Sequence, residues 1–245
     1  MTRTLEQAAA EASSCTKCRL AEGRTQVVYG VGAPDADLLF IGEGPGFHED
    51  KQGEPFVGAA GQLLTKMLQG IGLERSEVYI ANIVKCRPPG NRDPQPDEIE
   101  ACTPWLVEQI SLIQPRVVVT LGNFATKFVL NTSTGITRLR GQVHDWHGRT
   151  VIPTFHPAAI LHGGGEQSRQ FQLLKDDFAL VRSTLDDPGS REAPETPEPA
   201  IAASEPPSPG PATAAALEAT ASAPGVTDRI VAPETDPADE QLELF

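Results

Sequence analysis

The chain has 245 residues, of which 39% are hydrophobic, enough for one substantial core. It contains no apolar run long enough to cross a bilayer, and its first residues lack the apolar stretch of a signal peptide, so we expect a cytoplasmic protein with reduced cysteines. The formal net charge of -13 argues against a nucleic-acid partner, but residues 186–245 hold 13 of the 33 acidic side chains, and the remaining 185 residues are close to neutral.

The body of the chain alternates patterns typical of strands and of helices. Short apolar runs predict strands at Asp37 to Ile41, Val78 to Val84, Arg116 to Leu121 and Thr150 to Phe155. Helical patterns cover roughly Ala59 to Gln69, Pro96 to Leu112, Asn123 to Leu130 and Gln167 to Leu185. Such alternation predicts one α/β domain over residues 1–185, a three-layer αβα sandwich around a mainly parallel four-stranded sheet.

The composition changes near residue 186. From there the chain is rich in Pro, Ala, Glu and Ser, and it has no aromatic residue before Phe245. Such a segment buries too little apolar surface to offset the entropy lost on ordering. We therefore expect residues 186–245 to form a disordered acidic tether.

Three chemically distinctive segments each follow a predicted strand: GEGPG from Gly42 to Gly46, KCRPPGNR at residues 85–92, and FHPAAIL at residues 155–161. Because ligands of parallel sheets bind beyond the carboxyl ends of the strands, we expect all three segments at one edge. A local basic cleft there is as good an interpretation as scattered solvated charge for the flanking residues Lys85, Arg87, Arg92, Arg138 and Arg140.

The cysteines are spaced as Cys15-x2-Cys18, followed by Cys86 and Cys102. This spacing does not match a zinc ribbon, in which the second pair is also close. Four thiolates at such positions can bind a metal or a cluster, and the ligand type does not separate zinc from iron–sulfur. Four buried structural thiols are the alternative.

Other distinctive residues also have ordinary structural explanations. The GEGPG turn can be a simple connection, Phe56 a core aromatic, Asn82 a cap at a strand end, and His156 a structural histidine. An asparagine amide presents an acceptor on one side and a donor on the other, and turning it over exchanges the two. Asn82 therefore needs a neighbour that fixes its amide if it is to select one ligand.

Taken together, the segments GEGPG, PFVGAAGQLL, KCRPP and HPAAIL resemble those of the family 4 uracil-DNA glycosylases, in the same order, over roughly Cys15 to Leu185. The resemblance implies a monofunctional enzyme of base excision repair. Such an enzyme flips uracil out of DNA, hydrolyses its N-glycosidic bond and leaves an abasic site. It also implies a [4Fe-4S] cluster with a structural role, bound by Cys15, Cys18, Cys86 and Cys102.

The resemblance further implies a uracil pocket in which backbone N–H groups meet the base, Phe56 stacks on it, Asn82 reads its edge, and an N–H of His156 stabilises charge on O2. The pocket residues would be Gly42, Glu43, Gly44, Phe56, Asn82 and His156. Where other glycosylase families carry an aspartate that orients water, this chain has Gly44. The remaining catalytic candidates are therefore Glu43, Glu49 and Asn91, and Glu49 is also placed to exclude the thymine methyl group.

Two further features concern contacts with DNA and with other proteins. Ile160 and Leu161, just after His156, are expected to wedge into the base stack. The terminal QLELF resembles the peptide by which bacterial proteins bind the sliding clamp, although a short apolar terminus also arises by chance. Its candidate contacts are Gln241, Leu242, Leu244 and Phe245.

Another class of protein remains open on the sequence alone. A non-catalytic iron–sulfur DNA-binding adaptor, tethered to the clamp, would share the cysteines and the tail. It would have little need for Phe56, Asn82 and His156 together. A zinc-binding structural protein is a further alternative. The expected partners are uracil-containing DNA and the clamp, and the expected state is a monomer.

Overall fold

The computed structural model describes residues 3–187, which all lie within one compact unit. The predicted tether, apart from its first two residues, and the predicted clamp-binding residues Gln241, Leu242, Leu244 and Phe245 lie outside the described residues. No helix among the described residues is long and apolar enough to span a bilayer.

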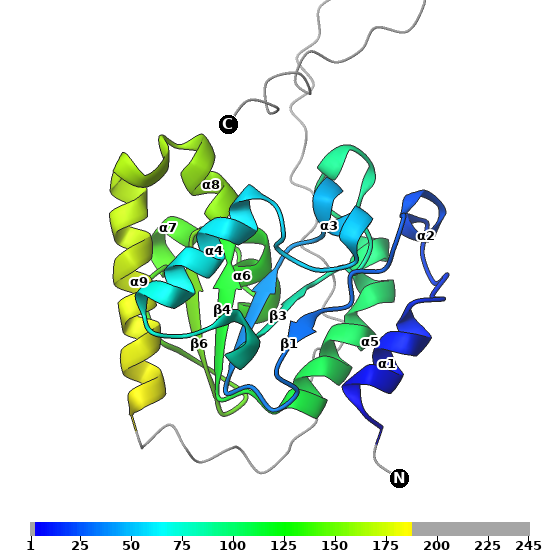
Figure 1. The fold of residues 1–245 in the computed structure, drawn as a ribbon, viewed down its shortest axis with the longest axis horizontal. Coiled ribbons are helices and arrows are strands. Elements are labelled where there is room, and N and C mark those ends of the chain that lie inside the picture. Colours follow the sequence, from blue (N-terminus) through cyan, green and yellow to red (C-terminus); the bar gives the residue numbers. More distant parts are fainter. Residues whose placement is uncertain (1–2, 188–245) are drawn as a thin grey trace, which may run out of the picture. The chain divides into compact units, whose positions relative to one another are not determined.

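A six-stranded sheet forms the centre of the described part, with strand order β1-β3-β2-β4-β6-β5 (Figure 1). Strands β2, β3, β4 and β6 pair in parallel, whereas β1 and β5 pair antiparallel at the two edges. The strands are β1 (Val31–Gly32), β2 (Leu38–Gly42), β3 (Tyr79–Asn82), β4 (Val117–Leu121), β5 (His144–Trp146) and β6 (Arg149–Thr154).

The prediction of four strands therefore has to be corrected to six. The four predicted strands are the parallel ones, and the two missed strands lie at the edges. β1 is only two residues long, and β5 is the short, partly exposed segment His144–Trp146, so neither presents an apolar run. β5 joins β6 through His147 and Gly148, whose φ angles of 52° and 74° suit a tight hairpin.

Helices cover both faces of the sheet. They are α1 (Leu5–Ala12), α2 (Leu20–Gly23), α3 (Phe47–Gln52), α4 (Ala59–Gly70), α5 (Pro96–Ile113), α6 (Gly122–Leu130), α7 (Ile136–Leu139), α8 (Pro157–His162) and α9 (Arg169–Asp186). Short 3-10 turns lie at Arg75–Glu77, Pro89–Asn91 and Gly165–Gln167. The four predicted helices correspond to α4, α5, α6 and α9, and the predicted three-layer sandwich is confirmed.

The alternation of side chains along β2 separates two apolar cores. Leu39 and Ile41 pack with residues of α1, α5 and α6 on one face. Leu38 and Phe40 pack with residues of α4, α8 and α9 on the other face. Both faces of each central strand are thus buried, which explains why these strands are continuous apolar runs in the sequence. All carboxyl ends of the parallel strands meet at the same edge, where the functional segments follow.

Candidate active site

The first wall of the candidate pocket forms where β2 and β3 end. Gly42 and Asn82 are aligned partners in the parallel ladder. A Cβ atom on Gly42 would lie 2.3 Å from Oδ1 of Asn82 and 2.8 Å from Cζ of Phe56. Glycine at position 42 is therefore what allows the Asn82 amide and the Phe56 ring to approach the same point.

Phe56 is held in an unusual backbone conformation. Its φ angle is 54°, a left-handed value that costs a residue with a side chain about 1–3 kcal/mol. The start of α4 packs directly on it, since a Cβ on Gly61 would lie 1.7 Å from the Phe56 carbonyl oxygen. The Phe56 ring is largely buried, and its centroid lies 5.5 Å from that of His156. The strained loop thus presents an aromatic face beside the histidine.

Glu49, on α3, fixes the same loop from the other side. Its Oε1 accepts hydrogen bonds from the backbone N–H groups of Val57 and Gly58, both at 3.0 Å. The other carboxylate oxygen lies close to Gly46, where a Cβ would be 2.8 Å away. The carboxylate of Glu49 is therefore anchored within the site by the loop that carries Phe56.

His156 follows β6 and caps α8. Its Nδ1 accepts a hydrogen bond of 3.1 Å from the backbone N–H of Ala158. Burial lowers the pKa of His156 to about 4, although the Glu49 carboxylate opposes this shift. Because a neutral imidazole carries only one proton, the accepting Nδ1 leaves that proton on Nε2. Gly122, with φ of +89°, makes room for the ring, since a Cβ there would lie 2.9 Å from the His156 Cβ.

Asn82 has a buried side-chain oxygen without a hydrogen-bond partner among the described residues. Its side chain is 1% exposed, and no described residue forms a hydrogen bond to its Oδ1. A buried acceptor without a partner costs about 1–3 kcal/mol, so such an atom points to a group that binds there. The strand end itself is firmly held, because Lys85 Nζ donates to the Asn82 carbonyl oxygen at 2.8 Å and to the side chain of Gln109.

Glu43 and Asn91 lie on the loop side of the site. Burial raises the pKa of Glu43 to about 7, and the neighbouring Asp93 carboxylate adds to the shift. Asn91 is exposed, has φ of 54°, and accepts a hydrogen bond of 2.6 Å from Arg87 Nε through its Oδ1. Sequence reasoning missed Asp93 and Gln109, because neither belongs to a recognisable motif and only the fold brings them to the site.

The predicted wedge requires a correction. Ile160 is fully buried in the core formed by β2, β4, α4 and α9, so it is not available to enter DNA. Leu161, the next residue on α8, is 40% exposed. Adjacent residues of a helix point in different directions, and only one of this pair faces outward.

For three of the five flanking cations, the structure does not favour the basic-cleft interpretation that the sequence left open beside scattered charge. Lys85 is 1% exposed, and Arg92 forms two hydrogen bonds to the buried Glu98 carboxylate at 2.6 and 2.9 Å. Arg140 is paired with the buried Asp177, which also accepts a hydrogen bond from Thr154. Of the five flanking cations, Lys85 is buried and both Arg92 and Arg140 are paired with buried carboxylates, which leaves Arg87 and Arg138.

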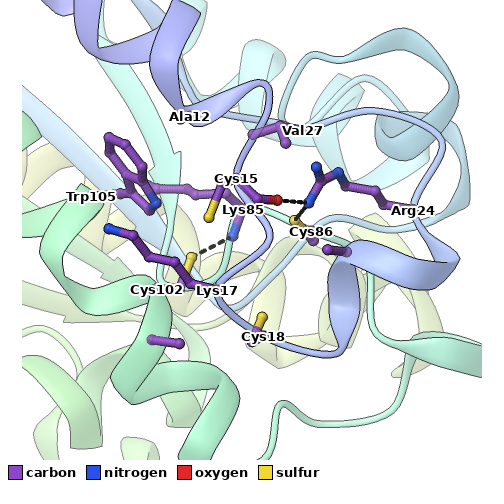
Figure 2. A pocket seen from close by; sticks show the side chains of 12 residues that line it. Ala12, Cys15, Lys17, Cys18, Arg24, Val27, Lys85, Cys86, Cys102 and Trp105 are labelled. Carbon is purple, nitrogen blue, oxygen red and sulfur yellow. Dashed lines mark hydrogen bonds between the residues drawn. The ribbon is translucent and has the colours of Figure 1, made fainter.

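All four cysteines line one pocket, and Figure 2 shows their sulfur atoms around a common opening. Cys15 and Cys18 lie between α1 and α2, Cys86 follows β3, and Cys102 is on α5. Among residues 3–187, no group of three or more His, Cys, Asp or Glu side chains is arranged to hold a single metal ion.

The donor set of this cysteine pocket consists of four thiols, which suits a metal or a cluster bound through sulfur. The backbone N–H of Lys85 donates to Cys102 Sγ at 3.2 Å, and Arg24 Nη1 donates to Cys86 Sγ at 3.4 Å, as Figure 2 shows. The residues that line the pocket include no carboxylate. Burial raises the pKa of the Cys102 thiol to about 11, so any metal that binds this sulfur has to displace a proton.

The fold and the site define a class of protein. Residues 29–179, more than half of the chain, match the family model described as the Uracil DNA glycosylase superfamily, and the chain belongs to this superfamily.

Particular relatives within that class are type-4 uracil-DNA glycosylases. The protein of that name from Sulfurisphaera tokodaii is 46% identical over 188 residues, which cover 73% of this chain and 84% of the relative. The one from Archaeoglobus fulgidus is 48% identical, over 65% of this chain and 84% of the relative. The one from Thermotoga maritima is 46% identical, over 70% of this chain and 89% of the relative.

Proposed function

We propose that this chain is a monofunctional uracil-DNA glycosylase. It hydrolyses the N-glycosidic bond of deoxyuridine flipped out of DNA and leaves an abasic site for base excision repair. One arrangement carries the proposal: a neutral histidine with its proton on Nε2 lies beside the Phe56 ring, at the sheet edge where the Asn82 amide oxygen has no described partner. The non-catalytic adaptor is not favoured, because it has no use for this arrangement.

The base would be recognised by stacking and by its polar edge. Phe56 offers an aromatic face, and uracil N3–H would supply the donor that the buried Asn82 Oδ1 lacks. The amide nitrogen of Asn82 would then donate to uracil O4. The backbone around Gly42, Glu43 and Gly44 borders this edge of the base. Selection of uracil rests on the amide orientation, since the reversed amide would present a donor toward N3.

His156 would stabilise the leaving group. Breaking the glycosidic bond places negative charge on uracil, notably on O2, while the sugar becomes an oxocarbenium ion. The Nε2–H of His156 is fixed by the Ala158 contact before the reaction begins, so no reorganisation is needed as the charge develops. A neutral donor suits this task because burial keeps the imidazole unprotonated at neutral pH.

Carboxylates would orient the attacking water molecule and stabilise the positive charge that develops on the sugar. Glu49 is the leading candidate to orient water, because two backbone N–H groups hold its carboxylate in the site. Glu43 and Asn91 are further candidates, and Glu43 has the raised pKa that a proton acceptor near neutral pH requires. A Glu49→Gln variant that excises uracil at the wild-type rate would contradict the role of Glu49.

The same proposal extends to the other contacts of the protein. Cys15, Cys18, Cys86 and Cys102 would bind a [4Fe-4S] cluster, whose chemistry when bound is to cross-link the segments that carry its thiolates. Visible absorbance of the purified protein tests this assignment, since zinc gives none. Leu161 would contact the base stack.

We also propose a cytoplasmic monomer that works near the nucleoid and binds the sliding clamp through its last residues. Support for clamp binding comes from the resemblance of QLELF to clamp-binding peptides.

The test of the catalytic proposal uses a single-uracil oligonucleotide, with abasic sites revealed by alkali. His156→Ala should lower the single-turnover rate by roughly 10²–10³-fold, the usual effect of removing one preorganised donor. His162→Ala is the matched control, because His162 lies exposed on the same helix, α8. Folded wild-type protein that leaves uracil intact in single and double strands would overturn the proposal and favour the adaptor.

A further inference from the structure

An exposed aromatic side chain lies at the rim of the candidate active site. Phe47 is 43% exposed and is one of three large hydrophobic side chains exposed among residues 3–187. It begins α3, directly after the GEGPG turn, and its neighbour His48 lies against Gly58 of the Phe56 loop, where a Cβ would be 3.6 Å from His48 Cδ2. The Phe47 ring is therefore at the surface, next to the loop that carries the stacking residue.

Two cations from separate segments gather on this ring. Lys51 Nζ, one turn further along α3, lies 4.1 Å from the ring centroid, and Arg87 Cζ, from the segment after β3, lies 5.0 Å from it. Arg87 is held in place because its Nε donates to Asn91 Oδ1 at 2.6 Å. Within the described part of the chain, neither Lys51 nor Arg87 has a carboxylate within ion-pair distance.

This arrangement differs from that of the other cations near the site. Arg92 and Arg140 are neutralised by buried carboxylates, whereas Lys51 and Arg87 place two like charges on one ring. Because no described carboxylate lies within ion-pair distance of either cation, an anion that binds beside the ring is attracted to both. A surface that combines an aromatic face with cations is also the chemistry that proteins use to bind nucleic-acid strands without reading their sequence.

We propose that Phe47, Lys51 and Arg87 form a binding site for the nucleotide next to the flipped uridine on the same DNA strand. The two cations bind its backbone phosphate, and the Phe47 ring packs against its sugar and base. This inference rests on the proposed function, because it needs a flipped nucleotide in the adjacent pocket. The site contributes affinity for DNA rather than catalysis.

Binding is measured by fluorescence anisotropy with labelled oligonucleotides that carry a stable abasic-site analogue, so that excision is not required. Lys51→Gln should weaken binding about fivefold and reduce the slope of log K against log salt by roughly 0.7–0.9, the value for one lost phosphate contact. Phe47→Ala should weaken binding several-fold with less change in that slope. Both variants should raise KM and leave kcat near the wild-type value.

Lys175→Gln is the matched control. Lys175 is an exposed lysine that lies 5.2 Å from the ring centroid of Phe171, but Phe171 is buried on α9. Its substitution removes the same charge and the same kind of contact without touching the proposed site. It should leave both affinity and salt slope unchanged.

A second readout reports contact directly. The two tryptophans of the chain, Trp105 and Trp146, are buried, so the Phe47→Trp variant adds an exposed indole at the proposed site. Its emission should be quenched when abasic-analogue DNA binds, since a base packs on the ring. Wild-type affinity and salt slope in Lys51→Gln and Phe47→Ala, together with no change in emission at saturating DNA, would overturn the inference.

The outcome is separable from that of the proposed function. If the wild-type protein binds DNA through these residues but excises no uracil, the proposed binding site is supported and the proposed glycosylase activity is contradicted. If uracil is excised and the variants bind DNA as the wild type does, only this inference fails.

Discussion

The protonation state of His156 follows from two neighbours. The Ala158 N–H occupies Nδ1, and the surrounding side chains remove the water that an imidazolium would need. Both effects favour the neutral ring with a proton on Nε2. The same residue type on an open surface would be partly charged near pH 6.5 and free to exchange tautomers. The functional property of this histidine therefore belongs to its environment and not to its motif.

The His156 imidazole should accordingly remain neutral well into the acid range. Nitrogen NMR of histidine-labelled protein should show the Nε2–H tautomer from pH 8 down to about 5, with protonation only near the pKa of about 4. The exposed His162 provides an internal comparison in the same spectra. A His156 signal that titrates near pH 6.5 would contradict the proposed leaving-group chemistry.

Glu43 should make stability depend on pH in the opposite sense from an ordinary carboxylate. Its pKa of about 7 in the folded protein exceeds the usual value, so between about pH 4.5 and 7 the folded state holds a proton that the unfolded state has lost. Stability contributed by this group is present below pH 4.5 and is lost as the pH rises through 7.

The Glu43→Gln substitution removes the loss of folding stability that accompanies ionisation of Glu43. Urea unfolding at pH 8 should show the variant more stable than the wild type by about 1 kcal/mol, a value reduced for the partial exposure of the group. The difference should vanish below pH 4.5. Glu100→Gln, at an exposed position on α5, is the matched control. Equal stability of Glu43→Gln and wild type at both pH values would refute the raised pKa.

At the scale of elements, the short helix α3 connects the cysteine pocket to the candidate active site. Arg24 donates to the Cys15 carbonyl at 2.6 Å and to Cys86 Sγ, and the next residue, Thr25, donates its N–H to the buried Asp50 carboxylate at 2.9 Å. Asp50 is adjacent to Glu49 on α3, and Glu49 holds the Phe56 loop. Two hydrogen bonds and two pairs of sequence neighbours therefore connect Cys86 Sγ to the residue whose carboxylate is proposed to orient water.

The Asp50→Ala substitution should perturb both the cysteine pocket and the position of Glu49 in the candidate active site. Loss of the buried acceptor is expected to reduce stability by about 1–3 kcal/mol, to lower kcat more than it changes KM, and to speed the loss of visible absorbance in the presence of an iron chelator. Asp50→Asn keeps an oxygen acceptor and should be close to wild type in all three measurements. An Asp50→Ala variant with normal kcat and a normal rate of chelation would show that the two sites are independent.

The edge strands illustrate what element prediction can achieve from this sequence. Buried parallel strands and amphipathic helices leave apolar patterns, and the predicted positions of β2, β3, β4 and β6 were close to those observed. β1 and β5 leave no such pattern, because they are short and pair only on one side. Their existence depends on a neighbouring strand that offers free backbone groups.

At the scale of the whole chain, charge is unevenly distributed. Most of the acidic excess lies in residues 186–245, while seven of the eighteen Lys and Arg side chains among residues 3–187 form ion pairs with carboxylates. Such a distribution limits nonspecific attraction to DNA and leaves binding to a few local contacts. A tethered anchor for the clamp would then supply local concentration by another route.

Clamp binding is tested in the full chain. Changing Leu244 and Phe245 together to alanine should weaken binding to a purified bacterial sliding clamp at least tenfold, because these residues fill the pocket in the proposed peptide mode. Excision of uracil from a short oligonucleotide should be unchanged. A Leu217→Ala change elsewhere in residues 186–245 serves as the control. Equal clamp affinity of all three proteins would rule out this anchor.

The sequence by itself determined the class of fold, the order of the central strands and helices along the chain, and the motif residues that meet at one sheet edge. These depend on local periodicity and on residue types that can be recognised one segment at a time. Only the tertiary structure decided that Ile160 is buried, that Arg92 and Arg140 are neutralised, and that Lys51 and Arg87 share the Phe47 ring. The exposure, the ion pairs and the pKa of a side chain depend on atoms that the fold brings together from distant segments. No local sequence pattern specifies which atoms these are.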